Sequence, residues 1–578
     1  MRVLLSTLNA KFIHSSLALA YLKEFCRDSA WETYIKEYTI NEKKENIMAD
    51  IFLSKPDILC FSCYIWNIQT ILAICEDLKK VIPGLVIVLG GPEVSYCARQ
   101  ILNENRALDF VIRGEGEHTL KEFLQAIFHQ DKFHEIKGLS YRENDSICEN
   151  PDRELITDLD TIAAPYNRKN LSYFKNRIIY YETSRGCPFD CSYCMSSTVK
   201  GVRFFSLKRV QEDLGFLIKH EVKEVKFVDR TFNCNEKRAQ EIMEFIIAQG
   251  GKTRFHFEIR ADLLSDEMTA FLKEVPPGIF DFEIGVQSTC PETLKSIKRK
   301  QDWSRLSHNV RTLRAAGNIR LHLDLIAGLP FEDYRRFSVS FNDVYSLSPH
   351  VIQLGFLKLL KGSSIRAAKK EHGYEFQKDP PYQVLKNNCL EYEELIRLSR
   401  IEELLGRYHN SGNMADTLSY IIENVFQGNA FRFYEHFASY WEDRGLFNIA
   451  HKTISEYSFL KDYIDSFHGS HSLLVNDLLK YDYLKNNKSH NLPPGIGSYN
   501  PQNASEVLYS VLKDKSFLQE NMPHMCSKTV REIRKQVHME YFRYDPFSLK
   551  ELKTASPYIF IYDPIRKKAK KIVALEEI

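Results

Sequence analysis

The first part of the chain alternates short apolar runs with longer amphipathic stretches. The apolar runs have the length of β-strands, and the amphipathic stretches place apolar residues at helical spacing. Strands that alternate with helices in this way are typical of a parallel sheet covered by helices. We therefore predict an α/β domain over residues 1–140. Its predicted elements are strands at 2–6, 57–63 and 85–89 and helices at 16–25 and 68–81.

Two glycine-containing turns follow strands of this predicted sheet. The apolar run ending at Leu89 leads into residues 90–93 (Gly-Gly-Pro-Glu), and the run 109–112 leads into residues 113–117 (Arg-Gly-Glu-Gly-Glu). Open α/β sheets bind ligands beyond the carboxyl ends of their strands, and glycine lets the backbone approach a ligand closely. The second turn has Thr119 where a dinucleotide fingerprint needs its third glycine, which argues against a nicotinamide cofactor.

A polar, proline-marked stretch at residues 141–172 separates this domain from a second α/β region, and we predict a linker there. The second region, residues 173–363, has six strand candidates, each followed by a stretch long enough for a helix. Such units suit an incomplete (β/α) barrel, whose functional residues lie at the carboxyl ends of its strands. The candidate strands are 178–182, 225–228, 254–259, 282–285, 321–326 and 351–357.

The last region, residues 364–578, has a different pattern and is predicted to be mainly helical. A strand-like run appears again only at 558–562. The basic run 566–571 lies between two strand-like pieces, which favours the solvated edge of a hairpin over a nucleic-acid contact.

The composition excludes some classes of protein but gives no information about the substrate. The 578 residues include 78 Lys and Arg against 76 Asp and Glu, so a net charge of +2 gives no field that favours a nucleic-acid or membrane partner. The apolar runs are far shorter than the roughly 20 residues of a membrane span. An odd number of cysteines, 13, without an apolar leader favours a reducing compartment, so we expect a cytoplasmic protein.

Three cysteines form the strongest chemical motif of the chain. Cys187, Cys191 and Cys194 follow a strand candidate, with three and two residues between them. Thiolates select zinc, copper(I) or iron–sulfur clusters, and a structural zinc site is normally closed by a fourth nearby ligand. The next cysteine is Cys234, and no histidine lies between Cys187 and His220. The spacing therefore favours a 4Fe-4S cluster with one open iron over a zinc site with a distant fourth ligand.

The motif resembles the Cys-x-x-x-Cys-x-aromatic-Cys loop of the radical S-adenosylmethionine (SAM) enzymes, with Tyr193 at the aromatic position. The resemblance covers about residues 172–363 and implies a SAM molecule bound at the open iron. It also implies SAM contacts from groups at the ends of the barrel strands. In addition to Tyr193, these are Asp229, Glu258, Arg260, Gln287 and Gly328.

Two of these assignments have structural alternatives. Glu258 and Arg260 are two residues apart on a strand and point the same way, so they could form an ion pair with each other instead of binding SAM. Asp229 could cap backbone groups instead of meeting a ligand.

The first domain resembles the Rossmann-like cobalamin-binding domain of cobalamin-dependent radical SAM proteins. The Asp-x-His-x-x-Gly motif of many cobalamin proteins is missing, which leaves the lower cobalt ligand open. His14, just after the first strand, is a candidate, and the alternative is a loop histidine satisfied by backbone. The resemblance implies cobalamin contacts from Asn9, His14, Gly90, Gly91, Pro92, Glu93, Gly114 and Glu115.

Together these resemblances imply an enzyme that reductively cleaves SAM and transfers a methyl group from cobalamin to an unactivated centre. An electron donor such as flavodoxin or ferredoxin would supply the reducing electron. Two alternatives stay open: the same cofactors used for oxidation, rearrangement or cyclisation, and a cobalamin- or iron-sensing protein with an idle barrel. The last region resembles a domain of unknown function that accompanies some members of the family.

Overall fold

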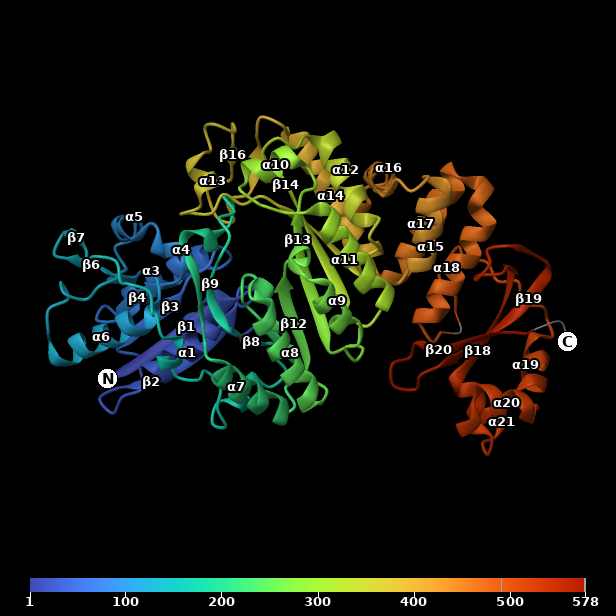
Figure 1. Cartoon of the computed structure of the whole chain (residues 1–578), viewed down its shortest axis with the longest axis horizontal. Coiled ribbons are helices and arrows are strands. Elements are labelled where there is room, and N and C mark those ends of the chain that lie inside the picture. Colours follow the sequence, from blue (N-terminus) through green and yellow to red (C-terminus); the bar gives the residue numbers. More distant parts are fainter. Residues whose placement is uncertain (490, 576–578) are drawn as a thin grey trace. The chain divides into compact units, whose positions relative to one another are not determined.

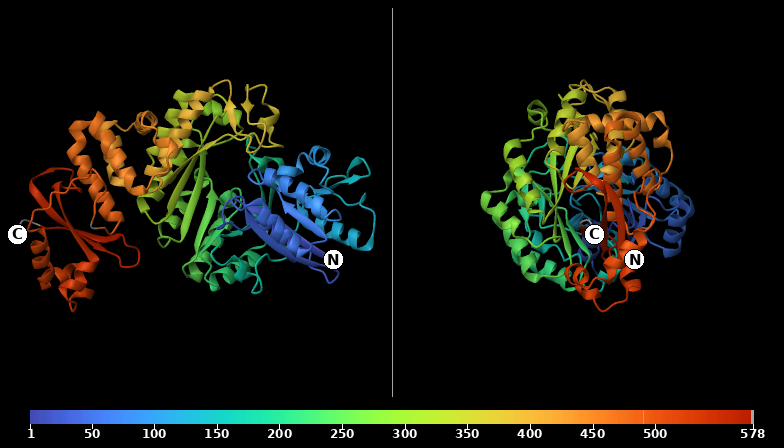
Figure 2. Two further views of the ribbon diagram at one scale, coloured as in Figure 1. Left: turned by 180° about the vertical axis from the view of Figure 1, so that it is seen from behind. Right: turned by 90° about the vertical axis from the view of Figure 1, so that its right-hand side faces the viewer.

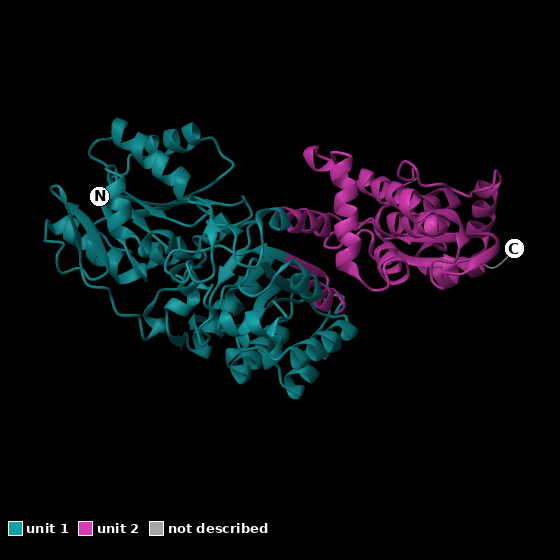
Figure 3. Cartoon of the chain, turned by 90° about the horizontal axis from the view of Figure 1, so that it is seen from above, with its two compact units in different colours: residues 1–340, 347–349, 354–395 teal, residues 341–346, 350–353, 396–578 magenta. Residues whose placement is uncertain are grey.

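The computed structural model describes residues 1–489 and 491–575, and the chain divides into two compact units (Figure 3). The first unit holds both α/β regions, and the second holds most of the C-terminal region. The first unit consists of residues 1–340, 347–349 and 354–395, and the second of residues 341–346, 350–353 and 396–578.

The N-terminal region folds around a seven-stranded sheet with the order β2-β1-β3-β4-β5-β6-β7 (Figure 1). Strands β1 to β5 pair in parallel, and β6 and β7 continue the sheet antiparallel. The order 2-1-3-4-5 belongs to doubly wound folds, which bind ligands where the strand order reverses, here beside β1 and β3. The strands are β1 Arg2–Asn9, β2 Glu32–Thr39, β3 Ile58–Ser62, β4 Val86–Gly90, β5 Phe110–Ile112, β6 Leu139–Glu143 and β7 Ser146–Glu149.

Three of these strands were not among the predicted ones. β2 is a polar edge strand that is mostly half-buried, so its sequence, Glu-Thr-Tyr-Ile-Lys-Glu-Tyr-Thr, has no apolar run. β6 and β7 form a hairpin that extends the sheet into residues 141–149, the start of the expected linker. Their short, partly polar sequences carry little strand signal in isolation.

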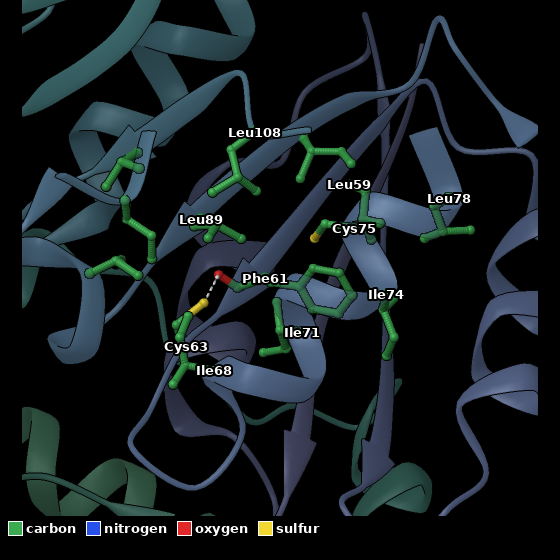
Figure 4. Packing of buried hydrophobic residues seen from close by; sticks show 14 of the residues in the cluster. Leu59, Phe61, Cys63, Ile68, Ile71, Ile74, Cys75, Leu78, Leu89 and Leu108 are labelled. Carbon is green, nitrogen blue, oxygen red and sulfur yellow. Dashed lines mark hydrogen bonds between the residues drawn. The ribbon is translucent and has the colours of Figure 1, made fainter. Parts of the chain in front are cut away.

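Helices cover both faces of this sheet. On one face the apolar side of α3 (Ile68–Val81) packs on β3 and β4, and Ile71, Ile74 and Leu78 are fully buried there (Figure 4). Cys63 and Cys75 are buried in the same cluster, where they pack as small apolar side chains. The other helices of this region are α1 Leu17–Phe25, α2 Lys44–Ser54, α4 Pro92–Ser95, α5 Ala98–Glu104 and α6 Gly116–His129.

The second α/β region forms an open six-stranded sheet with the order β15-β14-β13-β12-β11-β8. All six strands predicted for the barrel are present, so the predicted fold class is confirmed. They are β8 Ile179–Tyr181, β11 Glu224–Phe227, β12 Arg254–Ile259, β13 Phe280–Gln287, β14 Arg320–Ala327 and β15 Val351–Phe356. Helices on the outer side include α7 Leu207–Lys219, α8 Glu236–Gln249, α9 Asp266–Lys273 and α11 Trp303–Ala316 (Figure 2).

The barrel strands alternate between buried apolar and partly exposed polar residues. On β12, Phe255, Phe257 and Ile259 are buried, while His256 and Glu258 alternate with them on the opposite face. Because successive side chains of a strand point to opposite faces, the apolar side packs under the helices and the polar side lines the lumen. The lumen is therefore a polar surface that leads up to the strand ends.

The second unit is mainly helical and ends in an antiparallel sheet. Arg566–Lys568 lie in the turn between β19 and β20, which confirms the predicted hairpin. Among the described residues, no helix combines the length and apolar character that crossing a bilayer requires. The main elements are α14 Tyr392–Tyr408, α16 Ala430–Asp443, α17 Thr453–Phe467, α18 Ser472–Asn486, α19 Ala504–Lys513, β18 Val537–Tyr544, β19 Glu551–Tyr562 and β20 Ala569–Ala574.

We predict that Phe257→Ala destabilises the first unit by about 3–5 kcal/mol, because the ring is fully buried and its loss leaves a cavity. The ring stacks on Phe227 with centroids 4.7 Å apart and lies 4.6 Å from the ring of Phe232. Urea denaturation followed by tryptophan fluorescence measures the change. The control is Phe52→Ala on the exposed side of α2, which should cost less than about 0.5 kcal/mol. Equal losses in the two variants would contradict the assignment of this core.

Candidate functional site

A tight hairpin delivers the cysteine motif to the mouth of the barrel. β9 (Ser184–Cys187) pairs with β10 (Gly201–Phe204), and Gly186 has a φ of +99°. A Cβ atom on Gly186 would lie 2.1 Å from the carbonyl oxygen of Gly201. Glycine is required there both by the left-handed backbone and by the approach of the second strand.

All three cysteines line one cavity of about 180 Å³. Their loop is held on both sides at Ser192: its N–H donates to the Ile297 carbonyl at 2.9 Å, and its carbonyl accepts from the Ile365 N–H at 3.0 Å. The Sγ atom of Cys187 lies 3.7 Å from the Thr231 hydroxyl, just after β11. The loop is therefore fixed by backbone contacts, and its thiols face a common space.

Three thiolates that line one cavity form the donor set of an iron–sulfur cluster. Within residues 1–489 and 491–575, no group of three or more His, Cys, Asp or Glu side chains has the spacing of a metal-ion site. A single zinc ion needs all its sulfur ligands at about 2.3 Å from one point. In an iron–sulfur cube each cysteine binds its own iron, so the thiols stand further apart around a larger space.

Four of the predicted SAM residues line the same cavity: Tyr193, Glu258, Arg260 and Gln287. Arg260 does not pair with Glu258, so the structure does not contain the alternative ion pair between these two residues. Its guanidinium instead forks onto Asp262, with 3.0 Å between Nε and Oδ1, and lies 4.2 Å from the centre of the Phe189 ring. Its buried Nη1 has no hydrogen-bond partner among the described residues, which leaves a donor for a ligand in this cavity.

Two other predicted SAM residues do not line the cavity. Asp229 is buried and accepts hydrogen bonds from the Thr183 N–H at 2.9 Å and from the Thr183 and Ser184 hydroxyls at 2.6 Å. These contacts correspond to the capping alternative for Asp229. The Asp229 carboxylate connects the end of β11 to the start of the cysteine hairpin. The Gly328 carbonyl accepts from Tyr374 and Asn387 at 2.9 Å, away from the cysteines.

Sequence reasoning missed Arg299, which contacts the cysteine loop directly. Its Nη1 lies 3.3 Å from the Tyr193 hydroxyl and 3.9 Å from the Sγ of Cys191. Burial raises the pKa of the Cys191 thiol, and the Arg299 charge opposes that rise. Arg299 stands in a run of basic residues between helices, a pattern that looks like a solvated turn.

A second and larger cavity, about 690 Å³, opens at the carboxyl ends of β1, β3, β4 and β5. Its walls include seven predicted cobalamin residues. Gly91 in this wall is required by the fold itself, because its φ is +104° and a Cβ atom would lie 2.6 Å from the Cys63 carbonyl oxygen. The seven residues are Asn9, His14, Gly90, Gly91, Pro92, Gly114 and Glu115.

The eighth predicted residue, Glu93, does not line this cavity. It is buried, lies 2.9 Å from the Lys361 ammonium and accepts a hydrogen bond from Tyr382, so its contacts are with the segment after the barrel. His14 does line the cavity, and its Nδ1 lies 2.7 Å from the Tyr180 hydroxyl on β8. Burial lowers the pKa of His14, which favours the neutral ring.

The two cavities share two wall residues, Arg230 and Glu258. In the part of the chain that the structure describes, neither side chain has a recorded hydrogen bond or salt bridge. Burial raises the pKa of Glu258, and the nearby Glu283 raises it further. Arg230 was not predicted, although its place directly after Asp229 at the end of β11 is the signal that could have found it.

A largely buried ionic cluster joins the N-terminal sheet region to the barrel. Arg185 lies 2.9 Å from Glu182, 2.6 Å from Glu117 and 3.3 Å from Glu115. Arg203 on β10 lies 2.8 Å from Glu115. Burial raises the pKa of Glu182 to about 7, against the opposing charge of Arg185. Glu115 and Glu117 come from the second glycine turn, so this cluster fixes that turn against the cysteine hairpin.

Three family descriptions match the chain in order. A B12-binding domain matches residues 4–124, the radical SAM superfamily matches residues 181–344, and a protein family of unknown function, DUF4080, matches residues 370–561.

Curated relatives match the first two regions. An uncharacterized methyltransferase of Pyrococcus horikoshii, PH0819, is 30% identical over 49% of this chain and 62% of its own length. The cobalamin-dependent radical SAM methyltransferase TokK of Streptomyces tokunonensis is 25% identical over 52% of this chain and 47% of its own length. An anaerobic magnesium-protoporphyrin IX monomethyl ester cyclase of Synechocystis is 27% identical over 41% of this chain and 49% of its own length. The matches thus span less than two thirds of these relatives.

Solved structures share the fold. The cobalamin-dependent SAM radical enzyme OxsB, with aqua-cobalamin bound, has a TM-score of 0.58 at 15% identity and covers 90% of this chain and 76% of its own. The radical SAM methyltransferase TsrM of Kitasatospora setae has a TM-score of 0.55 at 17% identity and covers 64% of this chain and 76% of its own. These likenesses confirm the architecture of an N-terminal parallel sheet followed by an open barrel.

We predict that Arg299→Leu shifts the reduction potential of the reconstituted cluster to a more negative value, by tens of millivolts. Reduction adds negative charge, and a buried cation beside Cys191 stabilises the reduced state. A redox titration followed by electron paramagnetic resonance measures the shift. Arg299→Lys keeps the charge and serves as the control, with a smaller shift. An unchanged potential in the leucine variant would contradict the role given to Arg299.

Proposed function

The chain belongs to the cobalamin-binding radical SAM protein family, and from that premise we propose that it is a methyltransferase acting on an unactivated centre of its substrate. Its cofactors are a 4Fe-4S cluster, SAM and cobalamin. When bound, these groups supply a deoxyadenosyl radical, formed with methionine by cleavage of SAM, and a transferable methyl group.

The observation that best supports the proposal is that the two cavities share wall residues. The cysteines and Arg260 line the smaller cavity, and the ends of β1, β3, β4 and β5 line the larger one. A centre that is activated from one side and methylated from the other must lie where both cavities can reach it. Arg230 and Glu258 stand at that place, so we assign the substrate-reacting region to them.

The chain's own side chains have three tasks in this proposal. Cys187, Cys191 and Cys194 hold the cluster. Arg260 offers its unpaired Nη1 to an anionic group of SAM, for which a guanidinium is well suited. Tyr193 and Gln287 also line this cavity, and we assign to them the task of limiting the access of water to it.

The larger cavity is assigned to cobalamin through the strand ends. Gly90, Gly91 and Gly114 bring backbone to its wall without side chains in the way. His14 lines the same wall with one ring nitrogen held by Tyr180, so it can approach the corrin in one orientation. The lower cobalt ligand is not assigned.

The reaction needs an electron from outside the chain. We propose a small one-electron carrier such as flavodoxin or ferredoxin as the donor.

A second candidate is a radical reaction without methyl transfer. It is favoured by the similarity to magnesium-protoporphyrin IX monomethyl ester cyclases, two of which are 27% and 25% identical to this chain. The same junction of two cavities would serve oxidation or cyclisation, so product analysis must distinguish the two reactions.

The distinguishing experiment incubates the anaerobically reconstituted protein with SAM, cobalamin, dithionite and an extract fraction that stimulates turnover. Methyl transfer predicts S-adenosylhomocysteine and 5′-deoxyadenosine in comparable amounts, because one SAM remethylates cobalamin and another provides the radical. Deoxyadenosine alone, in step with consumption of a substrate, would favour the non-methylating reaction. Absence of SAM cleavage by protein with a full cluster would reject both.

We predict that Cys191→Ala loses most of its iron and all SAM cleavage after anaerobic reconstitution, because the cluster cannot be held by two thiolates. Cys234→Ala is the matched control, since Cys234 lines neither cavity, and it should keep both properties. Iron and sulfide analysis with quantification of 5′-deoxyadenosine gives the answer. Normal cleavage by Cys191→Ala, or equal losses in the two variants, would remove this cysteine from the site.

A further inference from the structure

Two basic segments of the first unit flank the cysteine loop. One follows the short helix α10 (Pro291–Ser296), and the other follows the start of α13 (Ser364–Ala367), both labelled in Figure 1. Residues 295–300 contain four basic residues and no acidic one, and residues 366–370 contain three and none. Five exposed lysines of these segments form what we call the lysine face: Lys295, Lys298, Lys300, Lys369 and Lys370.

Backbone hydrogen bonds attach both segments to the same residue of the cysteine loop. Ser192 donates to Ile297 at 2.9 Å and accepts from Ile365 at 3.0 Å, and the Ser364 hydroxyl also donates to the Ser192 carbonyl at 3.2 Å. The lysine face is therefore not a distant charged surface. It surrounds the segment between Cys191 and Cys194.

Neighbouring side chains of the first segment have opposite environments. Arg299 is directed inward and contacts Cys191 and Tyr193, whereas Lys298 and Lys300 are exposed. Consecutive Cα atoms are about 3.8 Å apart, so the exposed lysines are one residue away from a side chain that contacts a cluster ligand. This gives a short route from solvent to the cluster through ordered backbone.

In the described part of the chain, four of the five lysines have no recorded ion pair, and the exposed Glu292 and Glu371 border the two segments. Among the described residues, the one recorded ion pair of the five lysines joins Lys298 to Asp190 at 3.8 Å, and both side chains of that pair are well exposed. Exposed pairs of this kind contribute little. The whole chain carries a net charge of +2, so five lysines around one loop are a local concentration and not a general property of the surface.

We propose that the lysine face is the docking surface for a small acidic one-electron carrier protein. This inference rests on the proposed function, because it identifies the partner that reduces the cluster. Complementary charge raises the rate of encounter and orients the partners, which suits a carrier that must bind briefly and leave. In the transfer, the reduced carrier loses one electron and the cluster gains it, and no bond forms or breaks.

The test uses flavodoxin as the probe and the full-length, anaerobically reconstituted protein. The variant is Lys295→Glu/Lys298→Glu/Lys370→Glu, which reverses charge on both flanks without touching a cavity residue. The matched control is Lys515→Glu/Lys528→Glu/Lys553→Glu, three exposed lysines of the second unit that give the same change in net charge. Two quantities are measured: the affinity for immobilised flavodoxin, and the rate of cluster reduction by reduced flavodoxin.

For the lysine-face variant we expect affinity and reduction rate to fall by about tenfold or more, and the dependence of the rate on salt to weaken. The control triple should resemble the wild type. Equal affinity and equal rates in the two triples would overturn the proposal.

Dithionite provides the separate reference for the proposed function. It is a small reductant that needs no docking surface, so the lysine-face variant should cleave SAM with dithionite as the wild type does. Loss of dithionite-driven cleavage in the wild type would reject the proposed function but would leave the binding comparison valid. Loss of it in the lysine-face variant alone would mean that the lysines support the cluster loop itself, and would overturn the docking assignment.

Discussion

The arrangement of the first unit depends on the buried ionic cluster centred on Arg185. Its guanidinium is within 3.3 Å of carboxylates from the residue after β8 and from the second glycine turn of the N-terminal sheet. Charges with little exposure to solvent are costly unless they are paired, so the cluster favours the arrangement in which its guanidinium groups meet these carboxylates. That arrangement places the ends of the N-terminal strands opposite the cysteine loop. The meeting of the two cavities at Arg230 and Glu258 follows from it.

The polar lumen of the barrel contributes a second constraint on the same junction. Burial alone would raise the pKa of Glu283, but a hydrogen bond from His256 and the ammonium of Lys226 hold it at about 2. Glu283 is thus a fixed negative charge below the strand ends. It raises the pKa of the neighbouring Glu258, whose carboxyl has no such partners. Two glutamates on adjacent strands therefore have opposite protonation preferences because of their contacts.

The fold and the cysteine loop could be predicted because they depend on local patterns. Strands such as 254–259 alternate regularly between apolar and polar residues, and three thiols at short spacing have few chemical uses. Asp229 and Glu93 were harder to assign, because a carboxylate that follows a strand looks the same in sequence whether it meets a ligand or other groups of the protein. Arg299 was missed because its inward orientation is set by Ile297 and Ser192, a contact between segments about a hundred residues apart.

Some charged groups near the strand ends have hydrogen-bond or ion-pair partners and others do not. The positions of the unpaired groups bear on where the substrate could bind. Asp229, Glu115 and Glu283 each have several partners, as buried carboxylates require. Among the described residues, Arg230 and Glu258 have no recorded side-chain hydrogen bond or salt bridge, and the buried Nη1 of Arg260 has no hydrogen-bond partner. Natural proteins keep such unpaired groups mainly where a ligand completes them. The unpaired groups all line the smaller cavity, and two of them also line the larger one, which supports the proposal that SAM and a polar substrate supply the missing partners.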